Sequence, residues 1–140
     1  MLKNKILLVD DDKVSVQTTR DSLEAKNYEV IIANNGTLAL EIFKSNSVFV
    51  VITNLHMPVK SGIELANDLL LFENKPILII QSVESDMNLI RDLIQRGAYD
   101  YLLKPYNAVE LILRVDKAFE VAELRTIKGS MEKERQVRIS

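Results

Sequence analysis

The sequence predicts a single α/β domain built on a parallel sheet with helices on both faces. Five short apolar runs alternate with segments of helical periodicity along the chain, which is the pattern of strand–helix–strand units with right-handed crossovers. The runs at residues 6–9 and 77–80 are apolar throughout, as expected of central strands covered on both sides. At 140 residues the chain has the usual size of one domain.

The expected strands cover residues 6–9, 28–33, 48–53, 77–80 and 99–103, and the expected helices cover 13–26, 36–45, 62–72, 85–96 and 107–128. Capping signals support several of these boundaries. Ser61 with Glu64, and Asn107 with Glu110, have the spacing of capping boxes, in which side chains bond the free amides of a helix's first turn. Gly97 is well placed to end the fourth helix.

The composition excludes several classes of protein. A formal net charge of -2, with 47% hydrophobic and 27% charged residues, is typical of a globular protein and provides no basic nucleic-acid-binding surface. The absence of cysteine excludes disulfides, thiolate metal sites and thiol nucleophiles. The first apolar run is too short for a signal peptide or a membrane span. We therefore expect a cytoplasmic location, with no nucleic acid and no membrane bound by this domain.

Polar side chains gather where the expected strands end. In open parallel sheets, sites form at the carboxyl ends of the strands. The polar residues there are three acids after the first strand, an amide after the third, an amide and a hydroxyl after the fourth, and a lysine before a proline after the fifth: Asp10, Asp11, Asp12, Asn54, Gln81, Ser82, Lys104 and Pro105. The sequence therefore predicts an acidic cluster that faces one lysine.

Three segments carry a resemblance to a known family: residues 8–12 (LVDDD), 52–62 (ITNLHMPVKSG) and 97–105 (GAYDYLLKP). In this order, at the ends of the first, third and fifth strands, they resemble the CheY-like receiver domains of response regulators in bacterial two-component systems. The resemblance implies a (βα)5, flavodoxin-like, doubly wound five-stranded parallel sheet of strand order 2-1-3-4-5. It assigns residues 1–122 to the receiver domain and residues 123–140 to a helical extension or linker.

The family has an aspartyl-phosphate site, and the resemblance implies a role for each matching residue. Asp10 and Asp11 match the acidic pair that binds Mg²⁺, with Asp11 as the direct ligand; a favourable interaction with the helix dipole is the simpler explanation of acids at this place. Lys104 matches the lysine that neutralises the phosphoryl group, commonly beside a cis bond to Pro105; its alternative is a solvated surface lysine. His56 matches a position that supplies a backbone carbonyl, so its side chain is expected to be exposed.

Two departures from the family pattern decide the expected function. Asn54 stands where the family has its phosphoryl-accepting aspartate, and a neutral amide is a poor nucleophile. The acidic pair, position 54 and Lys104 then sum to about -1 instead of about -2, so any Mg²⁺ binding is expected to be weak. Gln81 stands where the family has a small hydroxyl residue that contacts phosphate. Its amide is long enough to block that space and to bond Asn54 or sit near Lys104.

Neighbouring residues receive lesser roles. Ser82 comes one residue too late for the missing hydroxyl, and successive strand residues point to opposite faces, so its side chain is expected to point elsewhere unless the strand bulges. Asp12 is expected only to begin the first helix. Tyr101 matches the family's aromatic switch, or is an ordinary strand aromatic. Without a phosphoryl group to drive a change, we expect one dominant conformation.

The sequence thus predicts an atypical, phosphorylation-independent pseudo-receiver that is not an enzyme and acts by binding. One alternative is a conventional Asp-phosphorylated receiver with an Asp-to-Asn change at position 54; that change alone does not explain Gln81. Another is a flavin-binding protein of similar topology. The acidic loop after Val9 disfavours it, because an anionic cofactor would be repelled there.

The expected partners are a sensor histidine kinase or another signalling protein, and a second copy of the chain. The resemblance implies that dimers and partners use the face made by the fourth helix, fifth strand and fifth helix. Val121, Leu124, Ile127 and Met131 are spaced to form a short helical seam, and fraying is expected near Gly129. Residues 123–140 are equally consistent with a solvated linker to an absent kinase, cyclase or DNA-binding output domain.

Overall fold

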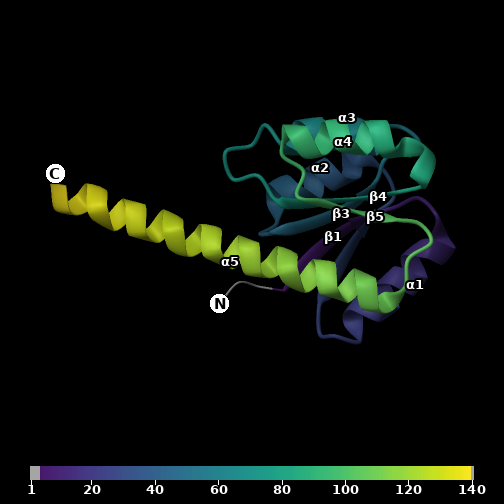
Figure 1. Ribbon diagram of the computed structural model, residues 1–140, viewed down its shortest axis with the longest axis horizontal. Helices are drawn as coiled ribbons and strands as arrows, with labels where there is room; N and C mark the ends of the chain where they lie inside the picture. The colour runs from purple at the N-terminus through teal and green to yellow at the C-terminus, as the bar shows by residue number, and fades with distance from the viewer. Residues whose placement is uncertain (1–3, 140) are drawn as a thin grey trace.

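The computed structural model describes the backbone of residues 4–139 and the side chains of residues 4–126. Within this range the strands form one parallel sheet in the order β2-β1-β3-β4-β5, as predicted (Figure 1). The strands are β1 (Lys5–Val9), β2 (Glu29–Ala33), β3 (Val50–Asn54), β4 (Ile77–Ser82) and β5 (Asp100–Leu103). Parallel pairing places all five carboxyl ends at one edge of the sheet.

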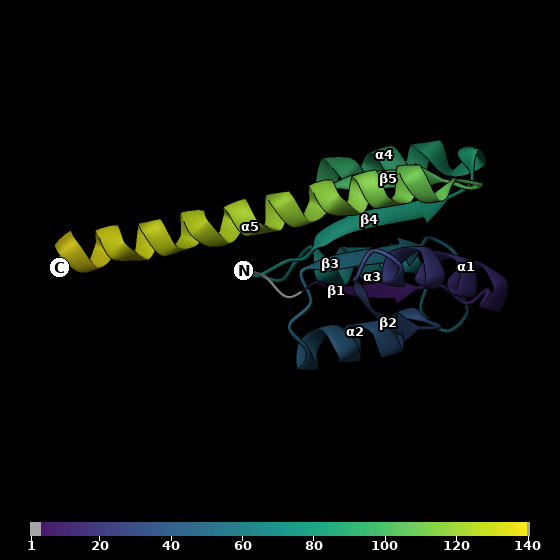
Figure 2. The same ribbon diagram turned by 90° about the horizontal axis from the view of Figure 1, so that it is seen from below.

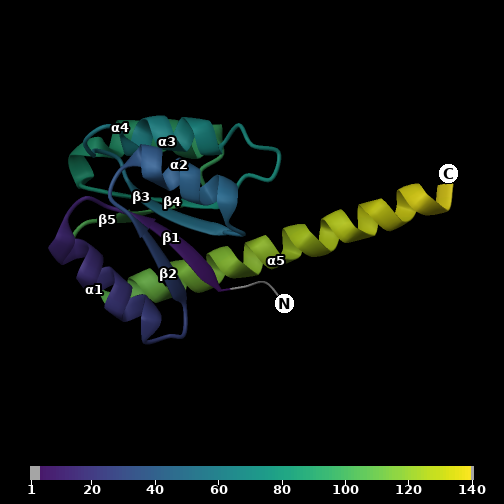
Figure 3. The ribbon, with the colours of Figure 1, turned by 180° about the vertical axis from the view of Figure 1, so that it is seen from behind.

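Helices cover both faces of this sheet. On one face lie α2 (Gly36–Ser45), α3 (Gly62–Leu69) and α4 (Met87–Arg96); on the other lie α1 (Lys13–Glu24) and α5 (Ala108–Ile139) (Figures 1 and 3). The helices expected at 13–26 and 62–72 end earlier than predicted, at Glu24 and Leu69. The helix expected at 85–96 begins only at Met87, because the 3-10 turn η1 (Glu84–Asp86) precedes it.

Each face of the sheet buries its own apolar cluster, which explains the continuous apolar runs of the sequence. The strands β1, β3 and β4 contribute alternate side chains to the two sides. The cluster under α2, α3 and α4 includes Leu7, Val51, Leu78, Leu65 and Ile90. The cluster under α1 and α5 includes Ile6, Ile52, Ile79, Leu111 and Val115.

Side-chain caps begin the helices where the sequence indicated, and a glycine ends α4. Asp12 is the N-cap of α1 and accepts from the backbone N–H of Val14, so its expected role at the helix start is confirmed. Ser61 and Glu64 form the predicted capping box. Asn107 Oδ1 accepts from the backbone N–H of Glu110 at 2.8 Å, at the start of α5. Gly97 ends α4 with φ of 123°, a conformation that favours glycine.

Gly62 fixes the start of α3 against the end of β3. A Cβ at this position would lie 1.5 Å from the backbone oxygen of Asn54. The backbone N–H of Gly62 also donates to the carbonyl of Leu55 at 2.9 Å. The loop between these elements therefore returns so closely over Asn54 that only glycine fits at position 62.

The last helix, α5, is 32 residues long and projects beyond the rest of the domain (Figure 2). The expected fraying near Gly129 is wrong, because the helix continues through it to Ile139. One helical glycine costs only about 1 kcal/mol relative to alanine, and the good helix formers Met, Glu, Lys, Arg and Gln follow it. In the predicted seam, Val121 is half-buried and Leu124 is exposed; Ile127 and Met131 lie outside the described side chains.

Among the described residues, no helix combines the length and the apolar character that a membrane crossing requires.

Candidate functional site

Four predicted site residues meet at the carboxyl edge of the sheet. Asp10 follows β1, Asn54 ends β3, Gln81 lies on β4, and Lys104 follows β5. The first three are buried, with exposed fractions of 2%, 9% and 1%. In the sheet register Asn54 is directly opposite Gln81 on the neighbouring strand. Of the predicted acidic cluster facing one lysine, only Asp10 joins Lys104 here, together with the two amides.

The carboxylate of Asp10 is the centre of this cluster. Its Oδ1 accepts from the backbone N–H of Asp12 at 2.9 Å and from Asn54 Nδ2 at 2.7 Å. Its Oδ2 accepts from Gln81 Nε2 at 3.1 Å and lies 3.5 Å from Lys104 Nζ. Burying a carboxylate is costly unless it is paired and bonded. Two amides, one backbone N–H and one ammonium supply that compensation here.

Gln81 bonds on both sides of its amide. Besides its bond to Asp10, its Oε1 accepts from the Tyr106 hydroxyl at 2.6 Å. That hydroxyl also lies 3.1 Å from Thr19 Oγ1 on α1. The sequence left two options for the Gln81 amide: a bond to Asn54 or a place near Lys104. No bond joins Gln81 to Asn54 among the described residues. Instead, Gln81, Asn54 and Lys104 all bond the carboxylate of Asp10.

Tyr106 is a site residue that sequence reasoning missed. Burial raises the pKa of its phenol, and the nearby charge of Asp10 raises it further, which outweighs the opposite effect of the bond with Thr19. The phenol therefore remains a proton donor at neutral pH. Its only signal in the sequence was its place directly after Lys104 and Pro105.

The Asn54 amide forms a hydrogen bond through its nitrogen but not through its oxygen among the described residues. Its Nδ2 bonds Asp10, while its Oδ1 is buried and has no hydrogen-bond partner among the described residues. A buried acceptor left unpaired costs about 1–3 kcal/mol. Turning the amide over would place its oxygen against the Asp10 carboxylate, so the observed orientation is the favourable one. Asn54 Oδ1 is thus a buried acceptor that no described residue satisfies.

Lys104 points into the site, as predicted. The peptide bond between Lys104 and Pro105 is cis. The backbone N–H of Lys104 donates to the carbonyl of Ser82 at 2.8 Å, and its side chain is about one quarter exposed. The alternative of a fully solvated surface lysine is wrong, because the ammonium lies beside the buried Asp10.

Asp11 is the residue predicted to bind Mg²⁺ directly. Its side chain is exposed and makes no hydrogen bond or ion pair within the described part of the chain. Hard oxygen ligands suit this ion, and the carboxylate of Asp11, the buried Oδ1 of Asn54 and the backbone carbonyl of His56 are oxygens of that kind. However, residues 4–126 contain no group of three or more acidic, histidine or cysteine side chains placed to hold a metal. The ligand atoms are therefore of the type that Mg²⁺ prefers, but the site carries little negative charge to attract the ion.

His56 and Ser82 belong to a separate cluster around Asp86. His56 is exposed, as expected, and its Nε2 lies 3.1 Å from Asp86 Oδ1. The Ser82 hydroxyl donates to the other oxygen of Asp86. The bond from Ser82, followed by that from His56, lowers the pKa of Asp86. Ser82 therefore points away from Asp10 and Asn54, as its strand position predicted.

Tyr101 lies outside the hydrogen-bonded cluster. It is half-buried on β5 and packs against the apolar cluster under α4. The guanidinium of Arg114 on α5 lies 5.8 Å from the centre of its ring. Arg114 also pairs with Asp100 at 2.7 Å and with Glu110 at 3.4 Å. Tyr101 thus joins the helices that flank β5, and no side-chain bond connects it with Gln81 in the described residues.

Comparison with known proteins agrees with this arrangement. The family defined as "Response regulator receiver domain" matches residues 6–116. The transcriptional regulatory protein CpxR of Escherichia coli K12 is 34% identical over 112 residues, covering 80% of this chain and 47% of CpxR. The transcriptional regulatory protein SrrA of Staphylococcus aureus is 28% identical over 129 residues, covering 92% and 53%. The chain spans about half the length of these curated relatives.

Solved structures show the same fold. A response regulator receiver domain protein from Clostridium thermocellum has a TM-score of 0.81 at 31% identity and covers 86% of this chain and 97% of its own. The chemotaxis response regulator CheY4 of Vibrio cholerae has a TM-score of 0.74 at 26% identity, with 81% and 97% covered. The chain has the fold of a CheY-like receiver. It belongs to the response regulator receiver domain family.

Proposed function

We propose that this chain is a phosphorylation-independent pseudo-receiver of bacterial two-component signalling, which acts through its surfaces and is not an enzyme. The observation that carries the proposal is the double amide at the site: Asn54 and Gln81 both donate to Asp10. The alternative is a conventional receiver with an Asp-to-Asn change at position 54. Gln81 bonds both Asp10 and Tyr106, so it is accommodated in this site, and this favours the pseudo-receiver.

Phosphoryl transfer needs a nucleophile and a place for the transferred group, and this site is poor in both. The amide of Asn54 is a weak nucleophile, and its nitrogen is directed at Asp10. Gln81 and Tyr106 occupy the neighbouring space with a short hydrogen bond of 2.6 Å. A phosphoryl group would have to displace bonds that already satisfy Asp10, Gln81 and Tyr106.

We propose that Mg²⁺ binds weakly if at all, and that it has no catalytic part. Asp11 would hold it with the oxygen of Asn54 and the carbonyl of His56. Lys104 lies beside Asp10 at 3.5 Å and already neutralises one of the two carboxylates. Each anionic ligand removed from such a site lowers its attraction for a divalent cation.

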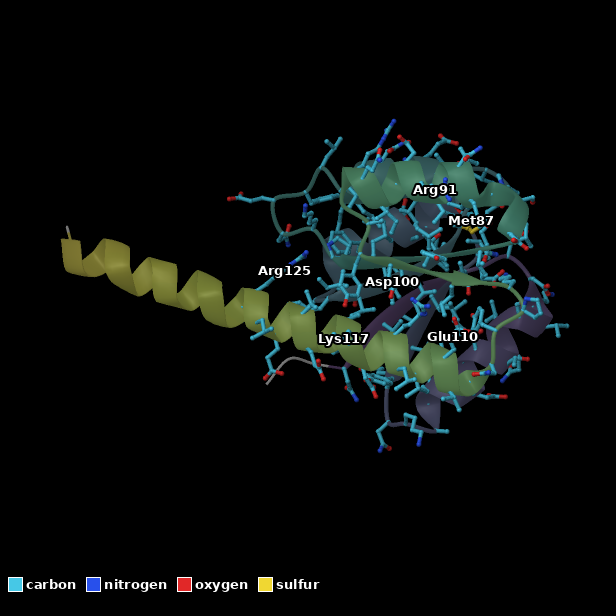
Figure 4. The ribbon with its side chains drawn as sticks, in the orientation of Figure 1. Met87, Arg91, Asp100, Glu110, Lys117 and Arg125 are labelled. Carbon is cyan, nitrogen blue, oxygen red and sulfur yellow. The ribbon has the colours of Figure 1, made fainter. Side chains whose placement is uncertain are left out.

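The interaction surface that we propose is formed by α4, β5 and α5, which together face the viewer in Figure 4. Arg91 on α4 and Lys117 on α5 lie on this face with the acidic Asp100 and Glu110 (Figure 4). Leu113 on α5 is also exposed, at 65%. A surface with both signs of charge can pair with itself across a two-fold axis. We therefore propose a homodimer through this face, or the docking of a signalling protein such as a sensor kinase.

We propose a cytoplasmic location, and that α5 connects the receiver domain at residues 1–122 with a further module beyond residue 140. CpxR and SrrA are named transcriptional regulatory proteins, and this chain matches about half of each. Any contact with nucleic acid would then belong to that module, because the chain has a net charge of -2.

The test is treatment with Mg²⁺ and acetyl phosphate, read by intact mass, and with beryllofluoride, read by NMR shifts. The chain should stay unmodified and unshifted. The Asn54→Asp variant combined with Gln81→Thr should respond to both reagents. A mass increase of one phosphoryl group on the unaltered chain would overturn the proposal. Colourless purified protein would dispose of the flavin-binding alternative.

A further inference from the structure

The opposite edge of the sheet, at the amino ends of β3 and β4, carries a cavity of about 730 Å³. It lies between the segment after α2, the segment before β4, and α5 where that helix leaves the domain. Its size is within the range of small-molecule sites. The cluster around Asp10 lies at the carboxyl edge, so the two sites share no lining residue.

The cavity has an apolar floor. The side chains of Phe43, Val48, Ile77 and Ala122 are buried, and Phe49 is half-buried. They come from α2, from the starts of β3 and β4, and from α5. A floor of this kind accepts an aromatic or aliphatic body.

The rim is polar and mainly basic. Among the described residues, Lys44, Lys75 and Arg125 line it together with a single acid, Glu73. None of the three cations has an ion-pair partner among the described residues. Lys75 Nζ would lie 3.4 Å from a Cβ built at Gly97, beside the carboxyl end of α4. Lys44 and Arg125 are the other two cations of the rim. The rim is therefore positive on a chain of net charge -2.

We propose that this cavity binds a small organic anion, with an apolar or aromatic body on the floor and a carboxylate or phosphate group against Arg125 and Lys44. Arginine suits this role because its planar guanidinium binds both kinds of anion through two parallel bonds. Arg125 lies at the margin of the domain, where α5 begins to project (Figure 4). A bound anion would hold α5 against the two neighbouring loops at this point. The chain would thereby respond to a ligand through a site that does not involve Asn54.

The experiment is an NMR titration with three probes: phenyl phosphate, inorganic phosphate and benzyl alcohol. Phenyl phosphate should shift the amides of residues 44–49, 73–77 and 122–126 saturably, and at least about tenfold more tightly than either of the other probes. Arg125→Gln should weaken this binding by about fivefold or more, since it removes one of the two cations that face the anion. Arg20→Gln is the matched control on α1, outside the cavity, and should bind as the unaltered chain does.

Four outcomes would overturn the proposal: no saturable shift with phenyl phosphate, equal binding by the Arg125→Gln variant, inorganic phosphate bound as tightly as phenyl phosphate, or shifts confined to the edge that carries Asp10. Ser47→Phe provides a second test that keeps every charge, because its ring would fill the mouth of the cavity. It should abolish the binding of phenyl phosphate while the spectrum elsewhere stays folded. None of these results depends on phosphorylation, so the proposal stands or fails separately from the pseudo-receiver function.

Discussion

The hydroxyl of Tyr106 donates a 2.6 Å hydrogen bond to Gln81 Oε1, and through it the loop after β5 is joined to the buried Asp10. Thr19 on α1 extends the same chain of bonds. Gln81, which departs from the family pattern, therefore forms a hydrogen bond at each end of its amide. The predictions below begin from this pair.

Removing the hydroxyl tests whether the pair stabilises the fold. Tyr106→Phe should lower the free energy of unfolding by about 1–3 kcal/mol, because Gln81 Oε1 loses its donor in a buried place. Urea unfolding followed by circular dichroism measures the change. In a Gln81→Met background the same substitution should cost clearly less. Equal costs in the two backgrounds would mean that the bond contributes nothing.

Placing an aspartate at position 54 should make the stability of the domain depend on Mg²⁺. In Asn54→Asp the bond to Asp10 is replaced by two carboxylates side by side, so without Mg²⁺ stability should fall by about 1–3 kcal/mol. Adding Mg²⁺ should recover most of the loss in thermal melts. The unaltered chain should show almost no shift of its melting temperature with Mg²⁺. A large shift in the unaltered chain would contradict the weak metal binding proposed above.

The cluster of Asp86 with Ser82 and His56 predicts that the free energy of unfolding falls at acidic pH. The folded-state pKa of Asp86 lies below its ordinary value of 3.8, so its contribution to stability is present above that pH and is lost as the pH falls further. Asp86→Asn should therefore reduce the loss of unfolding free energy between pH 5 and pH 2.5. Ser82→Ala should act in the same direction, because the bond from Ser82 is the largest cause of the shift. An unchanged pH profile in both variants would refute this.

Gly62→Ala tests the close return of the chain over Asn54. A Cβ would lie 1.5 Å from a backbone oxygen, which no side-chain rotation can relieve. We expect a loss of about 3 kcal/mol or more, or failure to fold. Gly129→Ala, inside α5, is the matched control and should preserve or increase the helical signal. Similar stability of the two variants would contradict the packing described here.

Charge reversal on the α4–β5–α5 face tests the proposed dimer. Arg91 has no ion pair among the described residues and is exposed on this face (Figure 4). Arg91→Glu should shift the chain toward monomer in analytical ultracentrifugation, and Leu113→Asp should do so more strongly. Arg20→Glu on α1 serves as the control. A chain that is monomeric at high concentration, or a dimer that tolerates both changes, would exclude this interface.

Most of the fold was predictable from local patterns. The five strands, their alternation with helices, the capping box at Ser61 and the terminating glycine at position 97 all follow from periodicity and capping, which act over a few residues. Strand ends converge at one edge in a parallel sheet, so the meeting of Asp10, Asn54, Gln81 and Lys104 was also predictable. The length of α5 was not predictable, because a single glycine among good helix formers does not show whether a helix stops or continues.

The sequence by itself determined which chemistry is missing: an amide stands at position 54 and another at position 81, whatever the folded geometry. Only the tertiary structure decided how these amides are used. Gln81 bonds Asp10 and Tyr106, and the oxygen of Asn54 has no partner within the described part of the chain. An amide has two donors and an acceptor that can meet any neighbour in reach. Its partners come from residues 25 to 71 positions away, so they are set by how the strands and helices pack and not by local sequence.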